Sequence, residues 1–145
     1  MSRQPRVAIV DRLVTAVNEH DLESLVACFA EGYVNETPAH PSRGFVGREQ
    51  VRRNWEQILS GVPDVRARVI RACVGEGAVW TEWELSGTRR DSSPFLMRGV
   101  VIYQVSNDSL TAARLYLEPV EPDAGDVDTA VRRVVGAREG TKETS

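Results

Sequence analysis

The strongest constraint on the fold is a change in the spacing of apolar residues at Pro63. Before this proline, apolar residues recur three and four positions apart, which predicts amphipathic helices over residues 7–17, 22–29 and 47–59. After it come segments of alternating apolar and polar residues, separated by short turns, which predict strands over residues 65–74, 78–90, 95–105 and 110–118. Helices first and hairpins afterwards are typical of an α+β fold, in which three N-terminal helices pack on a curved antiparallel sheet.

Length and composition fit one domain followed by a short tail. The chain has 145 residues, with 41% hydrophobic and 27% charged residues, as in ordinary globular domains. A further short strand is predicted over residues 33–37, where Pro38 ends it. We assign residues 1–120 to one domain and residues 121–145 to a C-terminal tail, either a weak helix capped by Asp126 or disordered.

Charge and residue spacing exclude several classes of partner. The net charge is −3 and the arginines are scattered, so no basic stripe is available for nucleic acid. No apolar run approaches the ~18 residues of a membrane span, and no signal-peptide block is present, so we expect a cytoplasmic protein. Cys28 and Cys73 lie in apolar segments and are expected to be buried. Because His20 and His40 lack any metal-ligand spacing, we expect neither a metal nor a cofactor.

Several local motifs occur in the same order as in a known superfamily. Residues 13–23 read LVTAVNEHDLE, a helix that ends in an Asn-x-x-Asp-Leu motif. Further matching stretches are FAEG at 29–32, TP at 37–38, GREQV at 47–51, VPD at 62–64, WELSGT at 83–88 and LYLE at 115–118. Together they resemble the nuclear transport factor 2-like superfamily, which includes the SnoaL-like proteins. The resemblance implies a cone-shaped, cystatin-like fold around an apolar pocket, a fold that serves both enzymes and non-enzymes.

Two catalytic residue sets of that superfamily have no counterpart here. The positions that match the tyrosine and two aspartates of the steroid isomerases hold Leu13, Val101 and Thr37. The positions that match the Asp–Arg–Asp set of the limonene epoxide hydrolases hold Trp83, Leu85 and Leu115. The resemblance also extends to the polyketide cyclases, whose reaction requires fewer protein groups. One acid/base group beside an apolar cavity can promote an aldol closure.

Strand alternation, anchored on these matched positions, predicts which side chains point into the cone. The predicted ligand-binding set is overwhelmingly apolar: Leu13, Val17, Val34, Trp55, Leu59, Trp83, Leu85, Met97, Val101, Tyr103, Leu115 and Leu117. The hydroxyl of Tyr103 would need a partner in such surroundings and is expected to orient a ligand oxygen. The competing interpretation is that these residues form an ordinary core.

Glu36 is the polar exception and the predicted acid/base group. A carboxylate in an apolar cavity has a raised pKa, which suits proton transfer near neutral pH. His40, in the loop after Pro38, is predicted to assist as a proton shuttle at the cavity mouth. Two alternatives stay open: the strand can twist Glu36 into solvent, or a slip of one residue can point Tyr33 and Asn35 toward the mouth instead.

The sequence therefore predicts a protein that binds a small apolar or aromatic molecule. If it is an enzyme, it is a cofactor-independent cyclase or isomerase that uses one carboxylate; the alternative is a non-catalytic homodimeric scaffold. An open cavity of ~300 Å³ with a convergent polar group favours the first interpretation. A homodimer is expected because several outward residues are too apolar to leave in water: Ile70, Val74, Trp80, Val100 and Ile102.

Overall fold

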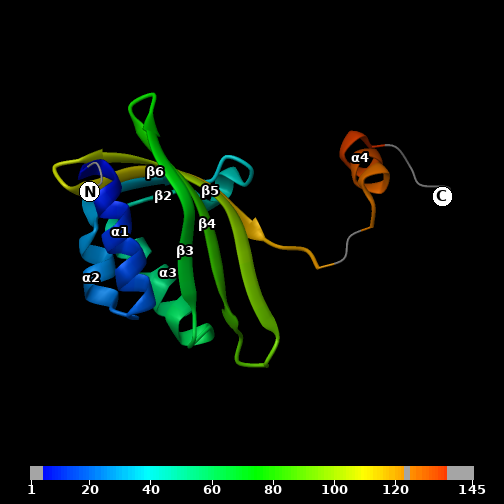
Figure 1. The fold of residues 1–145 in the computed structure, drawn as a ribbon, viewed down its shortest axis with the longest axis horizontal. Coiled ribbons are helices and arrows are strands. Elements are labelled where there is room, and N and C mark those ends of the chain that lie inside the picture. The colour runs from blue at the N-terminus through cyan, green and yellow to red at the C-terminus, as the bar shows by residue number, and fades with distance from the viewer. Residues whose placement is uncertain (1–4, 123–124, 137–145) are drawn as a thin grey trace.

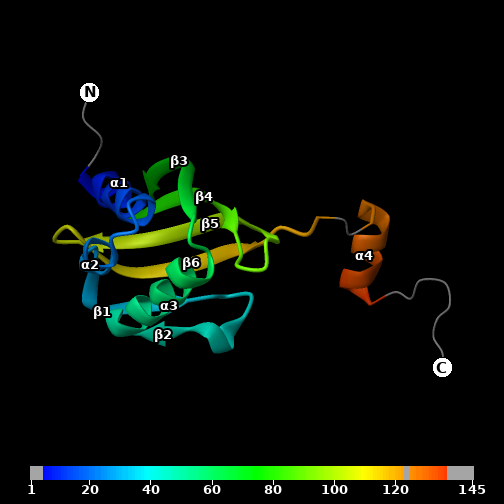
Figure 2. The same cartoon turned by 90° about the horizontal axis from the view of Figure 1, so that it is seen from below.

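The computed structural model describes residues 5–122 and 125–136 and shows the predicted α+β architecture. Three helices cover one face of a curved six-stranded sheet (Figures 1 and 2). The elements are α1 (Pro5–Asn18), α2 (Leu22–Ala27), β1 (Phe29–Glu36), the 3₁₀ turn η1 (Pro41–Arg43), β2 (Phe45–Val46), α3 (Arg48–Gly61), β3 (Arg66–Gly75), β4 (Ala78–Thr88), β5 (Pro94–Ser106), β6 (Ser109–Pro119) and α4 (Val127–Val135).

The sheet has the strand order β2-β1-β6-β5-β4-β3. Strands β3 to β6 form the predicted antiparallel meander, with each strand paired to the next. The first strand, β1, lies on the far side of β6 and pairs with it in parallel, which the sequence analysis did not anticipate. The neighbouring strands β1 and β6 therefore come from opposite ends of the domain.

Local sequence signals explain how the helices begin and which faces they bury. Val10 and Val17 of α1 are fully buried, as the spacing predicts. Asp21 caps α2, because its Oδ1 accepts a hydrogen bond from the Ser24 amide at 3.1 Å. Helix α3 begins after Gly47 and has only one buried residue, Val51. The rest of its apolar face is left to border the interior of the cone.

A bulge in β3 changes which of its side chains face the core. The register shifts between Val69 and Arg71, so Ile70 is an extra residue in the strand. Beyond the bulge the alternation is reversed: Val74 packs against the core, and the prediction that it faces outward is wrong. For the same reason Cys73, expected to be buried, is exposed.

Strand β5 approaches β6 closely at Gly99. Gly99 has φ +156°, and a Cβ there would lie 2.0 Å from the carbonyl oxygen of Tyr116 on β6. Only glycine can occupy this close approach. The sheet as a whole is curved, with the helices on its inner, concave face (Figure 1).

The C-terminal helix α4 has the predicted cap. Asp126 Oδ1 accepts a hydrogen bond from the Thr129 amide at 2.9 Å. Its valines are exposed (Val127, Val131, Val134 and Val135). The rest of the predicted tail, residues 123–124 and 137–145, lies outside the described residues. Within the described ranges, no helix is both long enough and apolar enough to cross a membrane.

Candidate functional site

A cavity of about 290 Å³ lies between the concave face of the sheet and the helices α1 and α3. Its wall is mostly apolar and aromatic. The predicted ligand-binding residues that line it are Leu13, Trp55, Trp83, Leu85, Met97, Val101, Tyr103, Leu115 and Leu117. Alternation along β4, β5 and β6 thus places the predicted side chains of these strands on one wall.

The cavity has a buried end and an open end. Tyr33 and Tyr103 lie at the buried end, where their side chains are 2% and 6% exposed. Arg43 and Asn54 lie at the open end, where Arg43 is exposed and Asn54 half-buried. The mouth is therefore framed by the η1 turn and helix α3.

Three of the predicted lining residues lie elsewhere: Val17, Leu59 and, on β1, Val34. Val17 is fully buried in the core between α1 and the sheet, but it does not border the cavity. Leu59 of α3 is half-buried and also lies off the cavity, whereas its neighbour Ile58 lines it. The face of α3 toward the cavity therefore includes Trp55 and Ile58 but not Leu59.

Strand β1 turns the opposite set of side chains to the cavity from the set that we predicted. Asn35 pairs with the inward-facing Ala113 of β6, and Glu36 pairs with the outward-facing Arg114. Tyr33 and Asn35 therefore line the cavity, while Val34 is 40% exposed on the outer face. The predictions that Val34 and Glu36 point inward are wrong, and the alternative of a one-residue slip describes the strand.

Glu36 is held on the outer face by an ion pair. Its Oε1 lies 2.6 Å from Nη1 of Arg114 on β6. Both side chains are exposed, the Glu36 side chain to 57% and the Arg114 side chain to 50%. The predicted acid/base carboxylate is thus separated from the cavity by the thickness of the sheet.

His40 does not line the cavity either. It follows β1 in the loop before η1, and its Nε2 lies 3.0 Å from Oε2 of Glu118 at the end of β6. The approach is not aligned as a hydrogen bond, and no other described residue donates to this oxygen. As placed, His40 cannot pass a proton to a molecule in the cavity.

The polar groups that do face the cavity come mainly from β1. The hydroxyl of Tyr33 donates to Oδ1 of Asn35 at 2.8 Å, and Nδ2 of Asn35 lies 3.4 Å from the Thr37 hydroxyl. Burial raises the pKa of Tyr33 and of Tyr103 above their usual value, so both phenols stay neutral and keep a proton to donate. The Tyr-x-Asn-x-Thr alternation was visible in the sequence and would have located this polar strip.

Other lining residues could not have been found from alternation. Phe29 and Phe45 flank the Tyr33 ring, with centroid distances of 4.8 Å and 6.0 Å. Phe29 was assigned to the second helix, and no helix or strand was predicted at Phe45. Their position depends on the pairing of β2 with β1, and no local sequence pattern predicts a strand of two residues.

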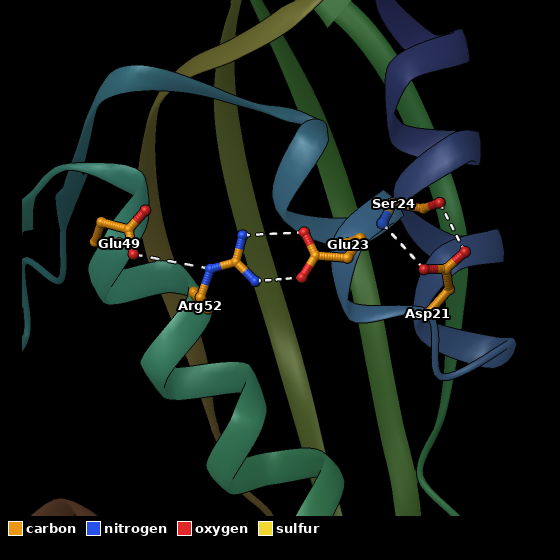
Figure 3. A network of polar contacts seen from close by, with 5 residues as sticks. All are labelled: Asp21, Glu23, Ser24, Glu49 and Arg52. Carbon is orange, nitrogen blue, oxygen red and sulfur yellow. Dashed lines mark hydrogen bonds and ion pairs between the residues drawn. The ribbon is translucent and has the colours of Figure 1, made fainter.

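Hydrogen bonds and ion pairs of Arg52 connect helix α3 to helix α2 (Figure 3). The guanidinium of Arg52 makes two hydrogen bonds to the Glu23 carboxylate, at 2.6 and 3.1 Å, and lies 3.8 Å from Glu49. The Arg52 guanidinium lowers the pKa of Glu23, through the hydrogen bonds first and charge attraction second. This bidentate pair holds the helical wall of the cavity in place beside the capped helix α2.

Comparison with known proteins identifies the family. A family model described as a SnoaL-like domain matches residues 10–113. The chain belongs to the SnoaL-like domain family. A comparison with curated protein sequences found no match.

Solved structures share the fold of this SnoaL-like domain at low sequence identity. Wild-type IdmH, a putative polyketide cyclase from Streptomyces antibioticus, aligns with a TM-score of 0.67 and 22% identity over 79% of this chain and 92% of that one. RV0760c from Mycobacterium tuberculosis, in complex with estradiol-17beta-hemisuccinate, gives 0.67 and 18% over 79% and 94%. A hypothetical protein from Catenulispora acidiphila with a ketosteroid isomerase-like fold, in complex with trimethylamine, gives 0.63 and 18% over 73% and 82%.

Proposed function

We propose that this SnoaL-like domain binds a small apolar or aromatic molecule in the cavity between the sheet and α3. The observation that carries the proposal is an unfilled space of about 290 Å³ in a protein interior. Interiors are normally close-packed, and a space of this size lies at the lower end of the range for ligand sites. A scaffold whose interior is only core would fill this volume with its own side chains.

The lining favours binding over acid/base catalysis. Among the described residues that line the cavity there is no carboxylate and no imidazole. The tyrosines are neutral donors at neutral pH, and Arg43 cannot act as a base there. The cyclase or isomerase activity expected through Glu36 therefore lacks its proton acceptor, and the proposal is a binding function.

The neighbouring structures support the same proposal. RV0760c is described with a steroid ester bound and the Catenulispora acidiphila protein with an amine, so related folds accommodate small molecules. The location that we predicted, the cytoplasm, stays part of this proposal. We also keep the homodimer as a proposal, because Trp80 and Tyr116 leave an apolar stripe exposed on the outer face of the sheet.

A cavity-filling variant tests the binding function. Leu117→Trp adds a large ring to the cavity wall, whereas Tyr116→Trp changes the preceding residue, on the opposite face. The neutral fluorescent probe N-phenyl-1-naphthylamine should bind the wild type and Tyr116→Trp alike. Leu117→Trp should bind it about tenfold more weakly, a loss of roughly 1.4 kcal/mol.

Native mass spectrometry of the purified protein gives an independent readout. A ligand that copurifies with the wild type should be missing from Leu117→Trp and retained by Tyr116→Trp. Equal probe binding by both variants would place the probe outside the cavity and refute the proposal.

A further inference from the structure

The buried end of the cavity contains a hydrogen-bond donor without an acceptor. Tyr103 is 6% exposed, yet its hydroxyl makes no hydrogen bond to any residue in the described ranges. The residue lines the cavity, and its hydroxyl oxygen can be reached by a solvent-sized molecule. A phenol hydroxyl this deep in an apolar interior normally has a partner. The cavity is the place from which a partner can come.

The sheet places a second polar residue on the same face as Tyr103. Ala113 of β6 pairs with Tyr103 on one side and with Asn35 on the other. Adjacent strands are ~4.8 Å apart, so Asn35 and Tyr103 flank the alanine at about 10 Å from each other. Ala113 itself is 2% exposed and does not border the cavity. The space for a partner is therefore the cavity that Tyr103 and Asn35 both line.

The charge around this end of the cavity determines what it accepts. The Asn35 Oδ1 is already engaged by the Tyr33 hydroxyl at 2.8 Å. The phenol of Tyr103 is kept neutral by burial, with the neighbouring Tyr33 and Cys28 acting in the same direction. The one cation among the described lining residues, Arg43, is exposed at the opposite end. An anion placed beside Tyr103 would be desolvated without a counter-charge, whereas a neutral oxygen would be satisfied by one donor.

We propose that the Tyr103 hydroxyl, beside Ala113, is a subsite for the neutral carbonyl oxygen of an aromatic ligand, such as an aryl ketone, quinone or lactone. The apolar body of the ligand then lies against Trp83, Val101 and Leu115, and its far end points to the mouth. The inference rests on the proposed binding function and adds the chemical class of the molecule and its orientation. It assigns a binding role to Tyr103, with no bond made or broken.

Two probes of nearly the same shape isolate the carbonyl. 2-Acetylnaphthalene carries a C=O group where 2-isopropenylnaphthalene carries C=CH₂. Calorimetry of both probes with the wild type, Tyr103→Phe and the outer-face control Tyr116→Phe gives a cycle in which general apolarity cancels. Tyr103→Phe should lower the affinity for the ketone about three- to tenfold relative to the affinity for the alkene, as expected for the loss of one neutral hydrogen bond. Tyr116→Phe should leave the ratio of the two affinities unchanged.

A measurement on the wild type alone covers the case in which Tyr103→Phe does not fold. The C=O stretching band of bound 2-acetylnaphthalene should lie at lower frequency than in hexane, because the hydroxyl donates to the oxygen. A band at the hexane position overturns the inference, as does a ketone-to-alkene ratio that Tyr103→Phe leaves unchanged. In both cases the binding function stands if the probes bind. If neither probe binds the wild type and Leu117→Trp matches it with every ligand, the proposed function fails as well.

Discussion

Glu36 and Tyr33 lie on one strand but on opposite faces of the sheet. The carboxylate of Glu36 is ion-paired with Arg114 on the outer face, and Glu36 is not among the described residues that line the cavity. Glu36→Gln should therefore leave ligand affinity within about twofold of the wild type and lower the melting temperature only slightly, as for other exposed pairs. Titration of N-phenyl-1-naphthylamine against both proteins measures the first effect and thermal denaturation the second.

A loss of binding in Glu36→Gln would show that the carboxylate reaches the ligand after all. Asn35→Ala is the matched comparison, because it changes the adjacent residue on the cavity side. It removes the acceptor of the Tyr33 hydroxyl and should alter affinity where Glu36→Gln does not.

Trp83 combines a structural and a binding role. It is 4% exposed, lines the cavity, and donates from Nε1 to the Thr81 hydroxyl at 2.8 Å. Trp83→Ala should lower the free energy of unfolding by ~3–5 kcal/mol in urea and also enlarge the cavity. Affinity for the naphthyl probes should fall in the protein that remains folded.

Trp80→Ala is the control for this change, since Trp80 lies on the outer face and is 40% exposed. It should cost much less stability and leave probe binding intact. A Trp83→Ala protein that loses stability but binds the probes as tightly as the wild type would make Trp83 a core residue only.

At the level of elements, the ion pair between α2 and α3 should give the protein a defined acid response. The pKa of Glu23 is lowered from 4.5 by the Arg52 guanidinium, so the stabilisation is complete above that value. It is lost as the pH falls through the depressed folded pKa. The melting temperature of Arg52→Gln should therefore lie below that of the wild type at pH 7, and the difference should shrink as the pH falls below about 4.5.

Arg53→Gln on the same helix is the control, because Arg53 bonds the neutral Gln50. Its difference from the wild type should not vary with pH in this range. If the difference in melting temperature between Arg52→Gln and the wild type stays unchanged down to pH 3, the arginine acts through packing and not through Glu23.

The elements show which kinds of information a single sequence carries. The helices and the strands β3 to β6 were predictable, because each has its own period and its own turns or cap, as at Asp21. The faces of β4, β5 and β6 followed from alternation, and with them most of the cavity wall. The inward set of β1 did not, because its register depends on pairing with a strand about 80 residues later. The bulge at Ile70 likewise has no local signal, and it misplaced Val74 and Cys73.

For the whole molecule, the outer face of the sheet predicts self-association. Ile70, Trp80 and Tyr116 are 37 to 40% exposed there, flanked by the Arg68–Glu84–Arg98 charge ladder. Apolar stripes of this kind within a polar rim are typical of protein interfaces. Sedimentation at micromolar concentration should give twice the 16.1 kDa mass of one chain.

Trp80→Arg should shift that equilibrium toward the single chain by placing a charge in the stripe. Val134→Arg, on the exposed face of α4, is the control and should leave the mass unchanged. A wild type that sediments as one chain would refute the dimer. Dissociation by Val134→Arg would instead move the interface to α4.

The parallel pairing of β1 with β6 also determines when the cavity can exist during folding. Glu36 and its partner Arg114 are 78 positions apart, so the wall formed by β1 is completed only when the last strand of the sheet has docked. Pairings between such distant segments form late, because the loop between them must be closed first. A chain still emerging from the ribosome thus has no binding site before β6 is made. A ligand that recognises only the completed cavity would slow unfolding and leave the rate of folding almost unchanged.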